Sequence, residues 1–159
     1  MLTLADALEA LTSIRPANAN AVITEAAVDS RLVIPASLFV AMPGESVDGH
    51  DFIEDAFKRG ASFALIQRDV DASFRTLDLR GDLTVNPTDN LDPPLCLRVD
   101  NSLSALQQIA RFWRRKLNLS VIGITGSVGK SSTKEMVAEV LGMRYRTLKS
   151  PGNLNNEIG

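Results

Sequence analysis

The chain has 159 residues, of which 45% are apolar and 23% charged, and its formal net charge is −2. These values are typical of a globular protein that holds one ordinary domain, or one small domain and part of another. The near-neutral charge predicts no bulk attraction to nucleic acid or to a membrane, so we expect neither partner. A local anion site stays possible, because glycine loops and helix N-termini bind phosphate without net basicity.

The sequence also indicates a compartment. Cys96 is the only cysteine, so the chain cannot form an internal disulfide. Asp6 and Glu9 interrupt the N-terminus early, without a basic start or an apolar core, so we expect no signal peptide. No apolar stretch is long enough to span a bilayer. We therefore expect a cytoplasmic protein.

Helical and extended patterns alternate over residues 1–100, which we predict to be one small mixed α/β domain. Apolar spacing predicts a helix near Leu4–Leu11 and another over residues 50–59, which Gly60 ends. Strands are predicted at 22–28, 37–42, 62–67 and 95–99. Residues 70–94 are rich in aspartate and proline and show no period, so we expect a long surface loop with room for a short hairpin.

We assign residues 101–159 to a second domain. Asn101 or Ser102 caps its first helix, and Arg111, Arg114, Arg115 and Lys116 are interpreted as the solvated end of that helix. The predicted apolar stripe is Leu103, Leu106, Ala110, Trp113 and Leu117. A strand at 120–125, a glycine turn, a helix at 130–141 and a second strand at 144–148 then predict the start of a P-loop ATPase domain with a parallel sheet. Two strands and one helix cannot cover such a sheet, so we expect this domain to be truncated.

The glycine turn predicts a phosphate site. Its glycines let the backbone aim several N–H groups at one anion, and the following helix adds its positive end. Lys130 supplies a mobile charge for the outer phosphates, and the Ser131 hydroxyl is a ligand for Mg²⁺. The predicted ATP-binding residues are Thr125, Gly126, Ser127, Val128, Gly129, Lys130, Ser131 and Ser132, with Lys130 as the catalytic residue.

The spacing departs from the standard phosphate-loop motif. The standard motif has a glycine where this chain has Ile124. The first loop glycine of this chain is Gly126. The alternative is a glycine-rich turn with an incidental lysine, but the strand before and the helix after favour the phosphate loop. A second metal ligand is usual in such sites. Glu157 is the better candidate than Asp100, although it is equally well explained as a surface carboxylate.

Several segments together resemble the Mur ligase family. These segments are 29–31 (Asp-Ser-Arg), 38–41 (Leu-Phe-Val-Ala), 44–45 (Gly-Glu), 48–53 (Asp-Gly-His-Asp-Phe-Ile), 125–132, 134–136 (Lys-Glu-Met) and 152–159 (Gly-Asn-Leu-Asn-Asn-Glu-Ile-Gly). The short glycine spacing is that family's own variant. Within the family the chain is most similar to the ligases that add D-alanyl-D-alanine to UDP-N-acetylmuramoyl-tripeptide.

The resemblance implies a reaction and residue roles. ATP would phosphorylate the terminal carboxylate of the UDP-linked tripeptide, and the amine of D-alanyl-D-alanine would attack the acyl phosphate. Ser30, Arg31, Glu45 and Ser46 would lie around the uridine and diphosphate, and Asn153 and Asn156 would shape the transfer site. Ser131 and Glu157 would bind Mg²⁺. The resemblance implies that the rest of the central ATPase domain and a C-terminal domain lie beyond Gly159, so the chain alone is expected to be inactive.

Other interpretations stay open at this point. Arg31 is equally well explained as an ion-pair partner of Asp29. The local sequence favours a turn at Asp48-Gly49 and a core or helix-start role for His50 over a functional one. A ligase that adds the third residue of the peptide shares the same N-terminal domain type. A non-catalytic module that binds the UDP precursor is the alternative from another class. The third residue of the substrate and the oligomeric state are not predicted.

Overall fold

A computed structural model describes residues 1–44, 47–81 and 90–151. They form two compact units, Met1–Asn118 and Leu119–Gly159. The predicted boundary at residue 100 falls earlier than this division, because the helix that follows packs with the first unit. Each unit is described by itself.

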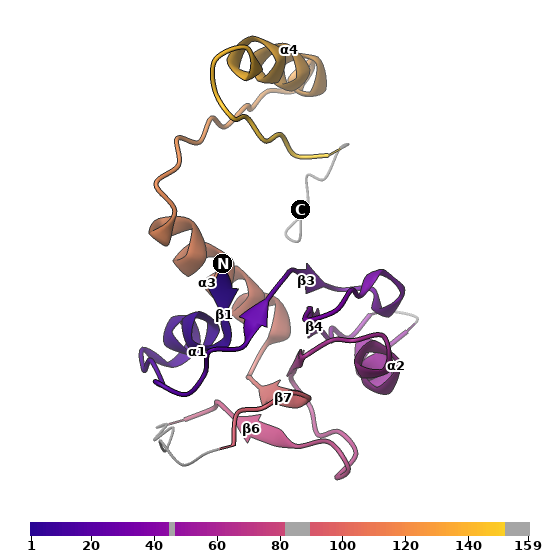
Figure 1. Ribbon diagram of the computed structural model, residues 1–159. Helices are drawn as coiled ribbons and strands as arrows, with labels where there is room; N and C mark the ends of the chain where they lie inside the picture. The colour runs from indigo at the N-terminus through magenta and orange to yellow at the C-terminus, as the bar shows by residue number, and fades with distance from the viewer. Residues whose placement is uncertain (45–46, 82–89, 152–159) are drawn as a thin grey trace. The chain divides into compact units, whose positions relative to one another are not determined.

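The first unit is built around a parallel sheet of five strands in the order β3-β4-β5-β7-β6 (Figure 1). The strands are β3 (Ala26–Ala27), β4 (Leu38–Val40), β5 (Phe63–Ile66), β6 (Thr76–Asp78) and β7 (Leu95–Arg98). A short antiparallel pair, β1 (Leu2–Thr3) with β2 (Val22–Ile23), lies outside this sheet. The mixed α/β class predicted for this part of the chain is confirmed.

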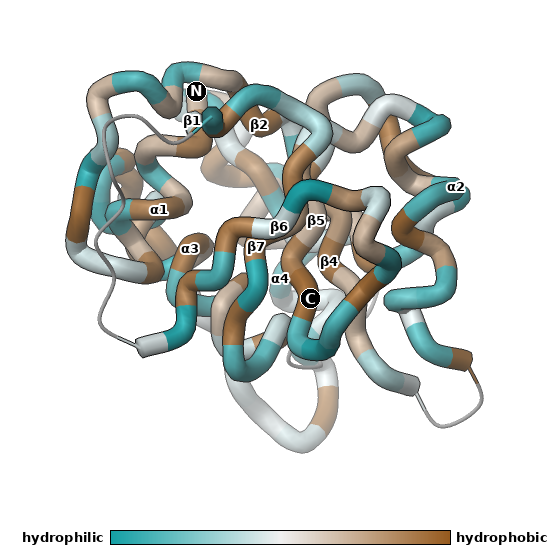
Figure 2. Tube along the Cα trace, turned by 90° about the horizontal axis from the view of Figure 1, so that it is seen from below, coloured by the Kyte–Doolittle hydropathy of each residue, from teal (hydrophilic) through white to brown (hydrophobic). Residues whose placement is uncertain are grey.

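Helices cover both faces of the sheet, as a parallel sheet requires. Helices α1 (Leu4–Thr12) and α3 (Ser102–Lys116) pack together on one side, and α2 (Ile53–Lys58) lies on the other (Figure 2). Two short 3-10 helices, η1 (Ser30–Leu32) and η2 (Gly49–Phe52), precede β4 and α2. Because strand side chains alternate between faces, the three inner strands β4, β5 and β7 each contribute to two cores.

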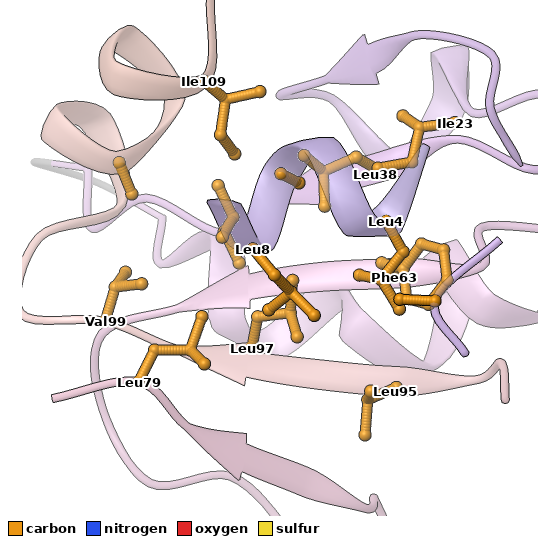
Figure 3. Packing of buried hydrophobic residues seen from close by; sticks show 14 of the residues in the cluster. Leu4, Leu8, Ile23, Leu38, Phe63, Leu79, Leu95, Leu97, Val99 and Ile109 are labelled. Atoms are coloured by element: carbon orange, nitrogen blue, oxygen red, sulfur yellow. The ribbon is translucent and has the colours of Figure 1, made fainter. Parts of the chain in front are cut away.

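The larger core lies between the sheet and the pair α1 and α3 (Figure 3). Phe63, Leu65 and Leu97 from the central strands meet Leu4 and Leu8 from α1 in it. The smaller core, on the α2 side, contains Phe39, Ile66 and Cys96 from the sheet and Ile53 and Ala56 from α2. The burial of Cys96 raises the pKa of its thiol to about 12, so this cysteine is a packing residue.

Several element predictions were wrong. Residues 22–28 form two short strands in different sheets, and the segment predicted as a loop contains β6, an edge strand parallel to β7 in place of a hairpin. The buried residues of α3 are Ser102, Ala105 and Ile109, whereas Ala110 from the predicted stripe is exposed. Within the described residues 119–151, neither predicted strand forms, and α4 (Lys130–Gly142) is the only helix.

Candidate functional site

The predicted phosphate loop leads directly into α4. Gly126 and Gly129 both have positive φ angles, +150° and +79°, which favour glycine over residues with a Cβ atom. Gly129 is the N-cap of α4 in a left-handed conformation, and its carbonyl accepts the first intrahelical hydrogen bond, from the Thr133 N–H at 2.9 Å. The backbone therefore turns sharply and enters the helix at Lys130, as the phosphate-loop interpretation requires.

Among the described residues, no side chain caps the N-terminus of α4. Ser, Thr, Asn or Asp is the usual N-cap because its side chain satisfies one of the first N–H groups of a helix. Glycine has no such side chain, so the first N–H groups of α4 can take an acceptor from outside the helix. The positive end of the helix dipole makes an anion favourable there. This helix end is therefore compatible with the predicted anion site, which remains a prediction.

Lys130 lies over the loop. Its Nζ atom donates a hydrogen bond to the carbonyl oxygen of Gly126 at 2.5 Å, so the side chain folds back across the glycine turn. The Lys130 ammonium group thus lies next to the glycine turn at which the phosphates are predicted to bind. The roles of Lys130 and of Ser131 remain predictions.

The chain after α4 returns to the first half of that helix. Lys134 Nζ donates to the carbonyl oxygen of Ser150 at 2.8 Å, and Lys149 forms an ion pair with Glu135. These contacts bring the last described residues beside the second turn of α4. Asn153, Asn156 and Glu157 lie outside the described residues, so their predicted roles are not tested.

Two of the predicted substrate residues of the first unit, Ser30 and Arg31, lie in η1. Asp29 caps this 3-10 helix, and Ser30, its first residue, is buried. Arg31 donates to both carboxylate oxygens of Asp29, which holds the pKa of Asp29 at about 2. The Arg31 side chain is nevertheless 79% exposed, so the ion pair expected from the sequence coexists with an accessible guanidinium. Glu45 and Ser46 lie outside the described residues.

His50 is a core residue, as the local sequence favoured. Its Nε2 atom accepts a hydrogen bond from the Gln67 N–H at 3.0 Å, and its Nδ1 atom lies 2.6 Å from a carboxylate oxygen of Asp48. Since Nε2 is an acceptor, the proton of the neutral ring is on Nδ1 and is donated to Asp48. The expected turn at Asp48-Gly49 is also present, at the start of η2.

The sequence did not predict the hydrogen bonds that surround His50 and its two partners, Asp48 and Gln67. Arg68 donates to Asp48 at 2.9 Å and to Asp51 at 2.8 Å, and the Gln67 side chain accepts from the Ser102 N–H at 3.0 Å. The pKa of Asp48 is about 2. The hydrogen bond from the His50 N–H is the largest cause, the His50 ring and Arg68 lower the pKa further, and partial burial of the carboxylate opposes them. These pairs join residues 17 to 35 positions apart in the chain, so no local pattern reveals them.

In the part of the chain that the structure describes, no cluster of three histidine, cysteine or carboxylate side chains can hold a metal ion. Over the same residues, no helix is long and apolar enough to cross a membrane.

Comparison with known proteins bears on both units. The family model "Mur ligase family, catalytic domain" matches residues 22–114, and "Mur ligase middle domain" matches residues 124–159. The UDP-N-acetylmuramoyl-tripeptide–D-alanyl-D-alanine ligase of Bacillus subtilis is 38% identical over 93% of the chain, and that of Escherichia coli is 36% identical over 82%. The chain spans 29% and 25% of the length of these two relatives.

Solved structures give the same result. MurF from Acinetobacter baumannii matches with a TM-score of 0.71 and 28% identity, covering 99% of this chain and 32% of that protein. MurF ligase from Thermotoga maritima, solved in complex with ADP, matches with a TM-score of 0.65 and 28% identity over 84% of this chain and 26% of its own. The parallel sheet, the phosphate loop before α4 and these matches agree, and the chain belongs to the Mur ligase family.

Proposed function

We propose that this chain supplies the UDP-precursor-binding unit and the ATP phosphate loop of a ligase that adds D-alanyl-D-alanine to UDP-N-acetylmuramoyl-tripeptide. The observation that carries the proposal is the turn at Gly126–Gly129, which enters an uncapped helix with Lys130 folded over it. The printed names of the relatives support the choice of substrates, and the ADP complex of a relative supports ATP as the nucleotide.

The reaction would proceed in two steps. The terminal carboxylate of the UDP-linked tripeptide attacks the γ-phosphorus of ATP, which gives an acyl phosphate and ADP. The amine of D-alanyl-D-alanine then attacks the acyl carbon, the amide forms, and inorganic phosphate and a proton leave. The protein's task in the first step is to hold the phosphoryl group and to neutralise its charge.

The loop residues fit that task. Backbone N–H groups from Gly126 to Ser132 would bind the phosphate oxygens, and Lys130 would exchange the Gly126 carbonyl for the γ-phosphate. The Ser131 hydroxyl and the predicted ligand Glu157 would hold Mg²⁺, which would supply positive charge to offset that of the phosphates. Asn153 and Asn156 would complete the transfer site.

In the first unit, the UDP end of the substrate would lie at η1 and at the loop after β4. The exposed guanidinium of Arg31 would contact the diphosphate, with Ser30, Glu45 and Ser46 around it. We also propose a cytoplasmic location, because the reaction consumes ATP and a UDP-linked precursor.

The test is a chimera in which this chain replaces the matching part of the Bacillus subtilis ligase. We expect phosphate release that requires ATP, UDP-N-acetylmuramoyl-tripeptide and D-alanyl-D-alanine together. Activity with the UDP-linked dipeptide and a single amino acid in their place would instead support the ligase that adds the third residue. A folded chimera that binds the UDP precursor but never releases phosphate would support a non-catalytic binding module.

A further inference from the structure

We propose that His50 is a positioning residue that fixes the loop after β4 for binding of the UDP precursor. The proposal rests on the proposed function, since it assigns a task to a residue beside the same site. His50 belongs to neither the predicted substrate residues nor the ATP-binding residues. Its side chain is 1% exposed, so it acts through the groups it contacts and not by touching substrate.

The loop after β4 forms two antiparallel arms, Met42–Gly44 and Val47–Gly49. The Gly49 N–H donates to the Met42 carbonyl at 2.8 Å, Pro43 pairs with Asp48, and the Gly44 N–H donates to the Val47 carbonyl at 3.1 Å. A Cβ atom at Gly49 would lie 2.7 Å from the Met42 backbone nitrogen, so the arms approach too closely for any other residue. Glu45 and Ser46 lie between the two arms in the sequence.

His50 connects the base of this loop to the neighbouring strand. Its ring accepts from the N–H of Gln67, the first residue after β5, and donates to Asp48 at the end of the returning arm. The connection continues beyond the ring, because the Gln67 side chain accepts from the Ser102 N–H at the start of α3. One buried ring therefore fixes the loop to the carboxyl edge of the sheet at β5 and, through Gln67, to α3.

A second connection, which lies at the surface, also holds Asp48. Arg68 donates to Asp48 and to Asp51, and its side chain is 48% exposed. Exposed ion pairs contribute little because water screens them, whereas a buried donor or acceptor left without a partner costs much more. The His50 ring is therefore the connection on which the position of the loop depends.

The experiment measures the affinity of the protein for UDP-N-acetylmuramoyl-tripeptide by calorimetry. We expect His50→Phe, which keeps the ring volume and loses both hydrogen bonds, to raise Kd by roughly tenfold. His50→Gln keeps a carbonyl acceptor near the Gln67 N–H and should recover part of the lost affinity. The matched control is Asp6→Asn, which weakens a buried polar network between α1 and α3, away from this loop, and should leave Kd within about twofold.

Amide hydrogen exchange gives an independent readout. In His50→Phe the Gly49 N–H should exchange faster, while amides of β5 and β7 keep their protection. An unchanged Kd in His50→Phe, or an equal loss in Asp6→Asn, would overturn the positioning role and leave the proposed function standing. A wild-type protein that does not bind the precursor would overturn the proposed function and this role together.

Discussion

The two compact units hold their functional residues in different ways. In Met1–Asn118, the described predicted substrate residues Ser30 and Arg31 lie in η1, between β3 and β4 of a sheet with buried cores on both faces, and the buried His50 ring accepts a hydrogen bond from the Gln67 N–H after β5. In the described residues 119–151 no side chain is buried, and the phosphate loop is defined by backbone turns and one helix end. The predicted site residues are therefore held by packed side chains in the first unit and by local backbone geometry in the second.

The largest contrast is expected in stability. Phe63 is fully buried in the larger core, and Val140 on α4 is 69% exposed. Phe63→Ala should lower the free energy of unfolding by about 3–5 kcal/mol, because it leaves a cavity. Val140→Ala should change it by less than about 0.5 kcal/mol. Chemical denaturation followed by circular dichroism measures both, and similar losses would show that α4 packs as tightly as the sheet does.

A comparable effect, on turnover instead of stability, is expected for Lys130→Ala in the Bacillus subtilis chimera. The loss of the one ammonium group over the loop should cost about 3–4 kcal/mol of transition-state stabilisation. Because the change lies in the second unit, the Kd for the UDP precursor should not move. A loss of precursor affinity together with turnover would contradict the separation of roles between the units.

A smaller effect is expected from the loop backbone itself. Gly129 has a φ of +79°, and no heavy atom lies within 4 Å of the position that a Cβ atom would take there, so Gly129→Ala would be limited by backbone strain alone. That strain is about 1–2 kcal/mol and should weaken ADP binding to the chimera by roughly tenfold. The control is Gly142→Ala at the end of α4, which should leave ADP affinity unchanged. Equal effects at both positions would argue against the left-handed turn.

The smallest effect concerns pH and the first unit. Burial raises the pKa of Asp6, but donation from Lys116, Arg15 and Thr3 outweighs it and brings that pKa well below its ordinary value of 3.8. The resulting stabilisation, about 1–2 kcal/mol, is fully present above about pH 5 and is lost as pH falls through the lowered pKa. Asp6→Asn should therefore flatten the decline of unfolding free energy between about pH 5 and pH 2. A decline as steep as in the wild type would show that other carboxylates carry it.

The sequence predicted best where a local pattern determines the structure. The helices α1 and α4, the strands β4, β5 and β7 and the turn at Gly126–Gly129 all have apolar periodicity or glycines at fixed positions. It missed β6 because an edge strand buries few side chains and lies in an aspartate-rich segment. It predicted strands at 120–125 and 144–148 from composition, but a strand exists only with a hydrogen-bonded neighbour.

The candidate site divides in the same way. The loop residues and the Asp29–Arg31 pair are neighbours in sequence, so their relation was predictable. The contacts of His50 with Gln67 and of Gln67 with Ser102 depend on the order of the parallel strands, which no local pattern determines.

We propose that backbone amides at the start of α4 bind the nucleotide phosphates. Residue-resolved amide exchange of the chimera, with and without ADP, tests it directly. We predict slower exchange on ADP binding for the N–H groups of Gly126–Ser132, while the Thr133 N–H, already bonded to the Gly129 carbonyl, changes little. ADP binding that leaves the amides of Gly126–Ser132 unprotected would contradict the account.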